Sequence, residues 1–329
     1  MKPLYEKLGP SWAMYTMDHR GTGRSARLDC QPRQVESRAS EGGTDITGNE
    51  SVQCSDVLRS RNRGKIGNLT YAFTVDEAAS DLAGVIALTR GSAAVHVYGV
   101  SYGTTLVHRY AQMFVASQHP SSITLDGITC SEGPRGERNT FGYWDVMQHR
   151  IGIELLRRCR EDGTFCRAKV GMRAGEDPES FIRSRIFPKV LSGECDIGTR
   201  DLRFVKGMLG MLLPSANTRS MIFALLTRIN RCSASDAAVL RQFVAMIVSA
   251  AAQDGTCVAG DSTLLYNNIA STEIWDIDPR TTVQELEGYV DAAIMCSPEN
   301  ISDLVRVFDA WPSYPLGPYF NKTGKSVSQ

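Results

Sequence analysis

A five-residue segment, Gly99–Gly103, limits the folds open to this chain more than any other feature of its sequence. This serine turn has the pattern G-x-S-x-G, occurs once, and lies between a β-branched run that ends at Val100 and a helical pattern that begins near Thr104. A tight turn from a strand into a helix forces backbone angles that only small neighbours tolerate, which would explain both glycines. The pattern predicts that Ser101 is an exposed nucleophile, and that the backbone N–H of Tyr102 points at a developing oxyanion. A glycine-rich turn that carries an incidental serine is the alternative.

The segments around the serine turn predict a parallel sheet. Trp12–Met17 is apolar and aromatic and is interpreted as a buried strand, as are Ala94–Val100 and Ser122–Leu125. A helix is expected from Thr74 to about Arg90, because Thr74 and Glu77 have the spacing of a capping box and an apolar stripe follows them. Strand, helix, strand, helix and strand in this order are typical of an α/β fold.

The remainder of the chain has a different character. Leu28–Gly67 is polar and lacks sustained periodicity, so a long surface loop is expected there. After Cys130 the pattern is almost entirely helical. We therefore expect a partial α/β core over residues 1–135, a large helical lid over 136–311, and a tail over 312–329. The expected helices of the lid are Trp144–Arg160, Pro178–Ile186, Leu202–Leu213, Arg219–Asn230, Asp236–Ala252, Thr282–Met295 and Ser302–Ala310.

Composition excludes two classes of partner. Lys plus Arg equals Asp plus Glu, 36 each, so the chain lacks the net positive charge expected of a nucleic-acid-binding protein. No apolar run approaches the roughly 20 residues that a membrane-spanning helix needs. The longest runs, Met208–Leu213 and Phe243–Ala252, are far shorter. A soluble globular protein is expected from this composition.

The cysteines favour an oxidising compartment. There are nine, none in a C-x-x-C pair, and histidine is too scarce for a zinc cluster. A disulfide framework with pairs such as Cys30–Cys54 and Cys159–Cys166 is one interpretation, and buried thiols are the other. Four N-x-S/T sequons add to the case for a secreted glycoprotein, although Met1–Leu8 lacks the apolar stretch of a signal peptide. The sequons are at Asn49, Asn68, Asn300 and Asn321.

Several motifs together resemble one family. Asp18–Ser25 (DHRGTGRS), the serine turn followed by Thr104, Tyr110-Ala111 and Leu125–Gly127 are similar in order and spacing to α/β-hydrolase serine peptidases. The closest resemblance is to proline iminopeptidases and tripeptidyl-aminopeptidase-like enzymes, in a version secreted by an oomycete or another eukaryote. The resemblance covers about residues 10–130 and implies a helical lid and a Ser–Asp–His triad in that chain order. It assigns Ser101 as the nucleophile, Tyr102 as an oxyanion donor, and Asp18–Ser25 as a structural turn. It also implies that the substrate is a peptide or another small acyl compound and that no metal or organic cofactor is needed.

The sequence also departs from this family. The family's core begins with several strands and a glycine-rich loop that supplies a second oxyanion donor, and only about a dozen residues precede Asp18 here. The triad histidine should follow the lid, yet no histidine lies beyond His149; the five are His19, His96, His108, His119 and His149. We therefore expect an incomplete hydrolase fold, from a partial gene model or a pseudoenzyme, with few core strands, no histidine at Ser101 and poor catalysis.

Three further hypotheses remain open. A catalytically inactive hydrolase fold that binds a peptide or partner through its lid is the main alternative. A dinucleotide-binding protein is a weaker one, because Gly21–Ala26 fits G-x-G-x-x-A but no apolar helix pattern follows it. Nine acidic residues between Glu273 and Trp311 either capture a substrate amine or form a solvated face. They are Glu273, Asp276, Asp278, Glu285, Glu287, Asp291, Glu299, Asp303 and Asp309.

Overall fold

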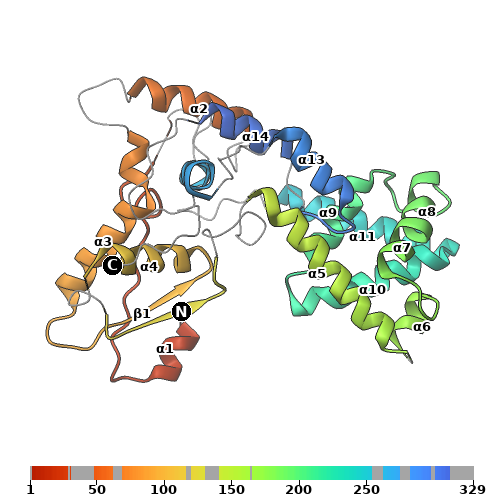
Figure 1. Cartoon of the computed structure of the whole chain (residues 1–329), viewed down its shortest axis with the longest axis horizontal. Helices are drawn as coiled ribbons and strands as arrows, with labels where there is room; N and C mark the ends of the chain where they lie inside the picture. The colour runs from red at the N-terminus through yellow and green to blue at the C-terminus, as the bar shows by residue number, and fades with distance from the viewer. Residues whose placement is uncertain are drawn as a thin grey trace.

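The computed structural model describes residues 2–28, 30, 48–61, 69–115, 120–129, 141–163, 165–253, 262–274, 282–297 and 301–311. Figure 1 shows the small sheet, with α3 and α4, at one end of the molecule. A larger group of helices, α5 to α11, lies at the other end. Most of the secondary structure in the described ranges is helical. Within these ranges, no helix combines the length and the apolar character needed to cross a membrane.

The β-α-β unit around the serine turn is confirmed. β1 (His96–Val100) and β2 (Ser122–Asp126) pair in parallel, with Val100 opposite Asp126. α4 (Tyr102–Met113) connects the two strands, and α3 (Val75–Thr89) packs beside it. Val97 and Gly99 face these helices, whereas Tyr98 and Val100, on the other face of β1, are about half exposed. β1 is therefore covered on one face, and the serine turn follows directly at its carboxyl end.

The strand expected at Trp12–Met17 is wrong. Residues 12–19 form no strand, and Trp12 and Tyr15 are largely exposed. The Trp12 ring lies beside the His96 ring at the start of β1, with 5.1 Å between centroids. An apolar run becomes a buried strand only where a neighbouring strand accepts its hydrogen bonds. Within the described part of the chain, β1 pairs with β2 alone, so this segment has no partner.

The surface loop expected at Leu28–Gly67 is wrong in part. α2 (Gly48–Arg61) lies inside it and packs along α14 (Ile301–Ala310), while residues 31–47 and 62–67 lie outside the described residues. The Cys30–Cys54 disulfide and buried Leu58 attach this helix to its neighbours. α2 could not be predicted from an amphipathic pattern, because polar residues also lie on its buried face. These residues are Glu50, Ser51 and Ser55. Two further elements without a sequence signal are α1 (Lys2–Leu8) and the 3₁₀ helix η1 (Leu69–Phe73).

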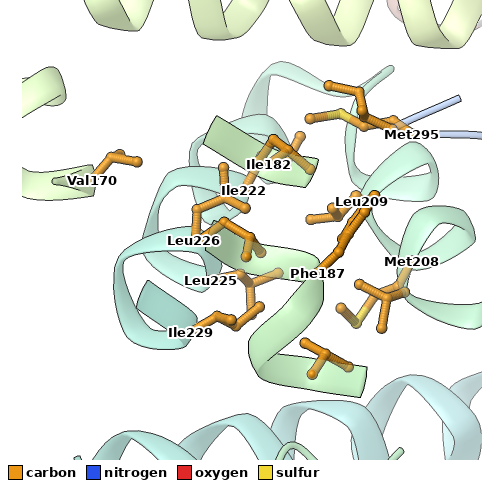
Figure 2. Close-up of a cluster of buried hydrophobic side chains, with 14 of the residues drawn as sticks. Val170, Ile182, Phe187, Met208, Leu209, Ile222, Leu225, Leu226, Ile229 and Met295 are labelled. Carbon is orange, nitrogen blue, oxygen red and sulfur yellow. The ribbon is translucent and has the colours of Figure 1, made fainter. Parts of the chain in front are cut away.

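The group of helices beyond residue 141 has a core of its own. It comprises α5 (Phe141–Glu161), α6 (Cys166–Val170), α7 (Pro178–Phe181), the π-helical turn η3 (Ile182–Ile186), α8 (Phe187–Ser192), α9 (Leu202–Leu212), α10 (Ala216–Arg231) and α11 (Ala234–Gln253). Figure 2 shows Phe187, Leu209, Ile222 and Leu226 from three helices meeting at its centre. α7, η3 and α8 are continuous, and η3 precedes Pro188, whose ring would clash with the carbonyl of Ser184 in a regular helix.

The last helices return to the sheet side of the molecule. α12 (Thr263–Ile269) and α14 pack with Leu28, Phe73 and Val75, and η4 (Ala270–Ile274) and α13 (Val283–Ala292) lie next to them. Trp311 joins the same cluster, and its indole N–H donates to Asn268. The division at residues 135 and 311 therefore stays a proposal based on chain position, whereas packing groups α12 and α14 with the N-terminal elements.

Both disulfides expected from the sequence, Cys30–Cys54 and Cys159–Cys166, are confirmed. A third, Cys195–Cys232, joins the segment after α8 to the end of α10. Cys296 is a buried free thiol, and Cys130 and Cys257 lie outside the described residues. Of the four sequon asparagines, Asn49 lies exposed in the first turn of α2, and Asn68, Asn300 and Asn321 lie outside the described residues.

Candidate active site

Ser101 is held in a backbone conformation that serine rarely adopts. Its φ is 53° and its ψ is −121°, a combination open mainly to glycine. Serine at the N-cap of a helix usually turns its hydroxyl onto the first N–H groups, but Ser101 makes no such capping bond. Its side chain is exposed, and its Oγ hydrogen-bonds to none of the described residues. The hydroxyl is therefore presented to solvent at the tip of the turn.

The two glycines of the serine turn have different roles. A Cβ on Gly99 would lie 2.6 Å from the backbone oxygen of Gly103 and 3.0 Å from Val107, so β1 and α4 approach too closely for any side chain there. A Cβ on Gly103 would meet no atom of the described residues within 4 Å. The backbone angles expected of the turn do not explain the two glycines, because neither glycine has a positive φ. The close approach of β1 and α4 accounts for Gly99, and Gly103 has open space beside it.

Tyr102 contributes its backbone N–H and a partly buried side chain. As the first residue of α4 its N–H has no acceptor within the helix, which leaves it available to an anion. Its hydroxyl lies 3.1 Å from Nε2 of His19, and Nδ1 of His19 lies 2.6 Å from the carbonyl oxygen of Arg20. A carbonyl only accepts, so the proton of a neutral His19 is on Nδ1, and Nε2 accepts from Tyr102. Burial lowers the pKa of His19 and raises the pKa of Tyr102, which keeps both groups neutral.

None of the described histidines hydrogen-bonds to Ser101. His96 bonds to the Ser122 hydroxyl at 2.6 Å, and His108 lies exposed on α4. Nδ1 of His149, on α5, accepts from the backbone N–H of Ile294 at 3.3 Å. His119 lies outside the described residues. The described residues also contain no cluster of three or more His, Cys, Asp or Glu side chains that would hold a metal ion.

A buried ion-pair network lies beneath the serine turn. Arg109, on α4, donates to Asp76 of α3 and lies 3.7 Å from Glu273 of η4. Glu273 also accepts a 3.0 Å hydrogen bond from the backbone N–H of Val75, at the N-terminus of α3. Glu273 belongs to the acidic stretch for which amine capture or a solvated face was expected. It is 4% exposed and serves neither purpose, because its carboxylate binds protein groups.

The Asp18–Ser25 segment forms a closed turn. Asp18 accepts from the backbone N–H of Arg24, and Gly21 bridges Arg27. The dinucleotide-binding hypothesis requires a helix that begins at Gly21–Ala26. Residues 21–28 begin no helix, so the structure does not support this hypothesis. Arg20 extends from this turn to Asp81 of α3 with two bonds of 2.6 and 2.7 Å.

Arg20 also changes the start of α3. It donates to the Glu77 carboxylate at 3.2 Å. The expected capping box is therefore only half formed. Thr74 accepts from the Glu77 N–H, while the Glu77 side chain binds Arg20.

Comparison with known proteins locates the resemblance in the same part of the chain. Residues 1–145 match a family model described as the alpha/beta hydrolase fold. No curated protein and no solved structure matches the chain. The matched segment contains the Asp18–Ser25 turn, the serine turn and both strands, and it ends within α5. Over residues 1–145 this chain is therefore similar to the alpha/beta hydrolase fold, which supports a hydrolase function.

Proposed function

We propose that this protein is a serine hydrolase in which Ser101 is the nucleophile. The observation that carries the proposal is the backbone of Ser101, which is held at positive φ between a strand and a helix with its hydroxyl exposed and not capping. Ser101 Oγ attacks the substrate carbonyl, and its proton passes to water, which later returns one to the leaving group, because none of the described histidines bonds to Ser101. The Tyr102 N–H stabilises the oxyanion, the leaving group departs with a proton, and water then hydrolyses the acyl-enzyme.

The substrate class follows from the family resemblance of the sequence. The order of the Asp18–Ser25 turn, the serine turn and Leu125–Gly127 is similar to that of peptidases that cleave from the N-terminus. We infer an aminopeptidase that acts on short peptides. The helices from α5 to α11 would form its lid and determine which side chains enter.

Hydrolysis of aminoacyl and tripeptidyl anilides tests this function. The chain is expected to cleave anilides with a free α-amine slowly, because none of the described histidines bonds to Ser101, and Ser101→Ala is expected to abolish the cleavage that remains. Acetylation of the α-amine should abolish cleavage of the same peptide. Cleavage that survives Ser101→Ala would overturn the nucleophile. If acetylated and free peptides are cleaved equally well, the proposal of a hydrolase would stand and the proposal of an aminopeptidase would be refuted. Tight peptide binding without any cleavage would favour the inactive binding protein.

We also propose that the protein is secreted. Three disulfides form within the described residues, and disulfides persist in oxidising compartments. A thiol count on denatured, unreduced protein from its natural source tests this. At least six of the nine cysteines, those of the three disulfides in the described residues, should be unreactive, and nine reactive thiols would refute the proposal.

A further inference from the structure

The carbonyl oxygen of Ser101 is the meeting point of two threonine side chains. Thr104, in the first turn of α4, places its hydroxyl 2.6 Å from this oxygen and its backbone N–H 2.9 Å from it. Thr129, three residues after β2 ends, places its hydroxyl 2.7 Å from the same oxygen. The nucleophile residue is thus bonded by its own helix and by a segment that follows the neighbouring strand.

The two threonines also bind each other. The backbone N–H of Thr129 donates to the Thr104 hydroxyl oxygen at 2.9 Å, and the two hydroxyl oxygens are 3.1 Å apart. Because the Thr104 oxygen already accepts from this N–H, its own proton is free to bond to Ser101. The Thr129 proton then serves Ser101 or Thr104. In either arrangement Thr129 supports the same carbonyl, directly or through Thr104.

The amide of Ser101 is fixed from the same side. It donates a 2.9 Å hydrogen bond to the carbonyl oxygen of Asp126, the last residue of β2. The N–H and the carbonyl of Ser101 are therefore both hydrogen-bonded. β2 supplies Asp126 to the N–H, and the segment after β2 supplies Thr129 to the carbonyl. A residue at positive φ persists only where its surroundings oppose relaxation, and these bonds provide that opposition.

We propose that Thr104 and Thr129 are positioning residues that hold Ser101 in its nucleophile conformation. Thr129 has the more specific role, because its hydroxyl is the side-chain group from beyond α4 that reaches the Ser101 carbonyl. The inference rests on the proposed function in one respect, that the held conformation matters for the reactivity of the Ser101 hydroxyl.

Three variants separate the Thr129 hydroxyl from general packing. Thr129→Val removes the hydroxyl and keeps the shape, Thr129→Ser keeps the hydroxyl, and Thr124→Val changes an exposed threonine on β2 that takes no part in the network. The first readout is the second-order rate at which a fluorophosphonate labels Ser101. Thr129→Val should lower this rate about 10-fold, the equivalent of one hydrogen bond, whereas Thr129→Ser and Thr124→Val should stay within about twofold of the original chain.

The second readout does not depend on activity. Hydrogen exchange of the Ser101 amide reports whether its bond to Asp126 persists. We expect faster exchange in Thr129→Val and unchanged exchange in Thr129→Ser. If the original chain is not labelled at all, the proposed function fails while the exchange rates still judge the role of Thr129. Unchanged labelling and exchange in Thr129→Val, or equal losses in Thr129→Ser, would overturn the inference.

Discussion

At the scale of single residues, Ser101 has a strained backbone conformation and an exposed hydroxyl. A side chain at φ 53° and ψ −121° is strained, by roughly 1–3 kcal/mol. Glycine reaches the same angles without that penalty. Strain of this kind is expected where a reactive group must be displayed, because an ordinary N-cap serine would use its hydroxyl to satisfy the helix.

Replacement of Ser101 by glycine and by alanine measures this strain. Neither variant has the hydroxyl, so both should be inactive. Ser101→Gly should nevertheless be more stable than Ser101→Ala by about 1 kcal/mol, because only alanine keeps a Cβ at positive φ. Urea unfolding of the two variants gives the difference. A more stable alanine variant would mean that Ser101 has an ordinary backbone in solution.

Alanine at Gly99 and at Gly103 should have opposite effects. Gly99→Ala places a Cβ 2.6 Å from a backbone oxygen, and overpacking of this kind costs about 1–3 kcal/mol. Gly103→Ala has open space and lies within α4, where alanine is favoured over glycine by up to about 1 kcal/mol. Thermal unfolding of both variants checks this prediction. Equal destabilisation would show that the turn is crowded on both sides.

At the scale of elements, α4 connects the serine turn to the rest of the molecule through charge. Arg109 leaves the buried face of α4 to meet Asp76 on α3 and Glu273 on η4. Asp76 and Glu273 lie far apart in the chain, so this network fixes the distant η4 against the helix that carries Ser101. Arg109 and Glu273 are buried and Asp76 is partly buried, and a buried charge that loses its partner is costly.

Removal of Arg109 should destabilise the fold strongly. Arg109→Met keeps much of the side-chain volume but leaves the buried Glu273 and the partly buried Asp76 without this cation, at a cost of about 3–5 kcal/mol. Arg157→Met, in an exposed ion pair with Glu154 on α5, is the control and should change stability little. Chemical unfolding of both variants is the measurement. A loss no larger than that of the control would mean that Arg109 is exposed in solution.

The elements that could be predicted are those whose local signal agrees with their packing. A clear hydrophobic periodicity, a helix cap or a β-branched run marks each of these elements. They are α3, β1, α4, β2 and the long helices after residue 141. Trp12–Met17 has the composition of a strand but finds no partner in the described residues. α2 has no apolar stripe and is held by Cys30–Cys54 and by α14.

At the scale of the whole molecule, two partly buried histidines join distant parts of the chain. His19 links the Asp18–Ser25 turn to Tyr102, and His149 links α5 to the segment after α13. Ser101 and Tyr102 could be predicted from a local motif. These long-range contacts, and those of Glu273, could not, because nothing in the local sequence records which distant group a buried polar side chain will meet.

Stability should fall as the pH is lowered below neutral. Burial lowers the pKa of both His19 and His149 from 6.5, so the unfolded chain binds more protons than the folded chain. The stability present above pH 6.5 is therefore lost progressively as the pH falls through the folded pKa values. Urea midpoints between about pH 7 and about pH 5, above the range where most carboxylates titrate, measure the effect.

A single variant assigns part of this pH dependence. His149→Asn keeps an acceptor for the Ile294 N–H and cannot titrate, so its midpoints should vary less with pH. The charged groups around His149 are Glu179, Arg183, Arg150 and Lys206, and they remain in the variant. A pH dependence identical to that of the original chain would assign the effect to other groups.

The most direct test of the central claim is to locate a covalent adduct. The folded chain is treated with diisopropyl fluorophosphate, and the modified residue is identified by tandem mass spectrometry. We predict one phosphoryl adduct, on Ser101, that is absent from Ser101→Ala and from the chain unfolded before treatment. An adduct on another residue, or none on Ser101 in the folded chain, would contradict the assignment of Ser101 as the nucleophile.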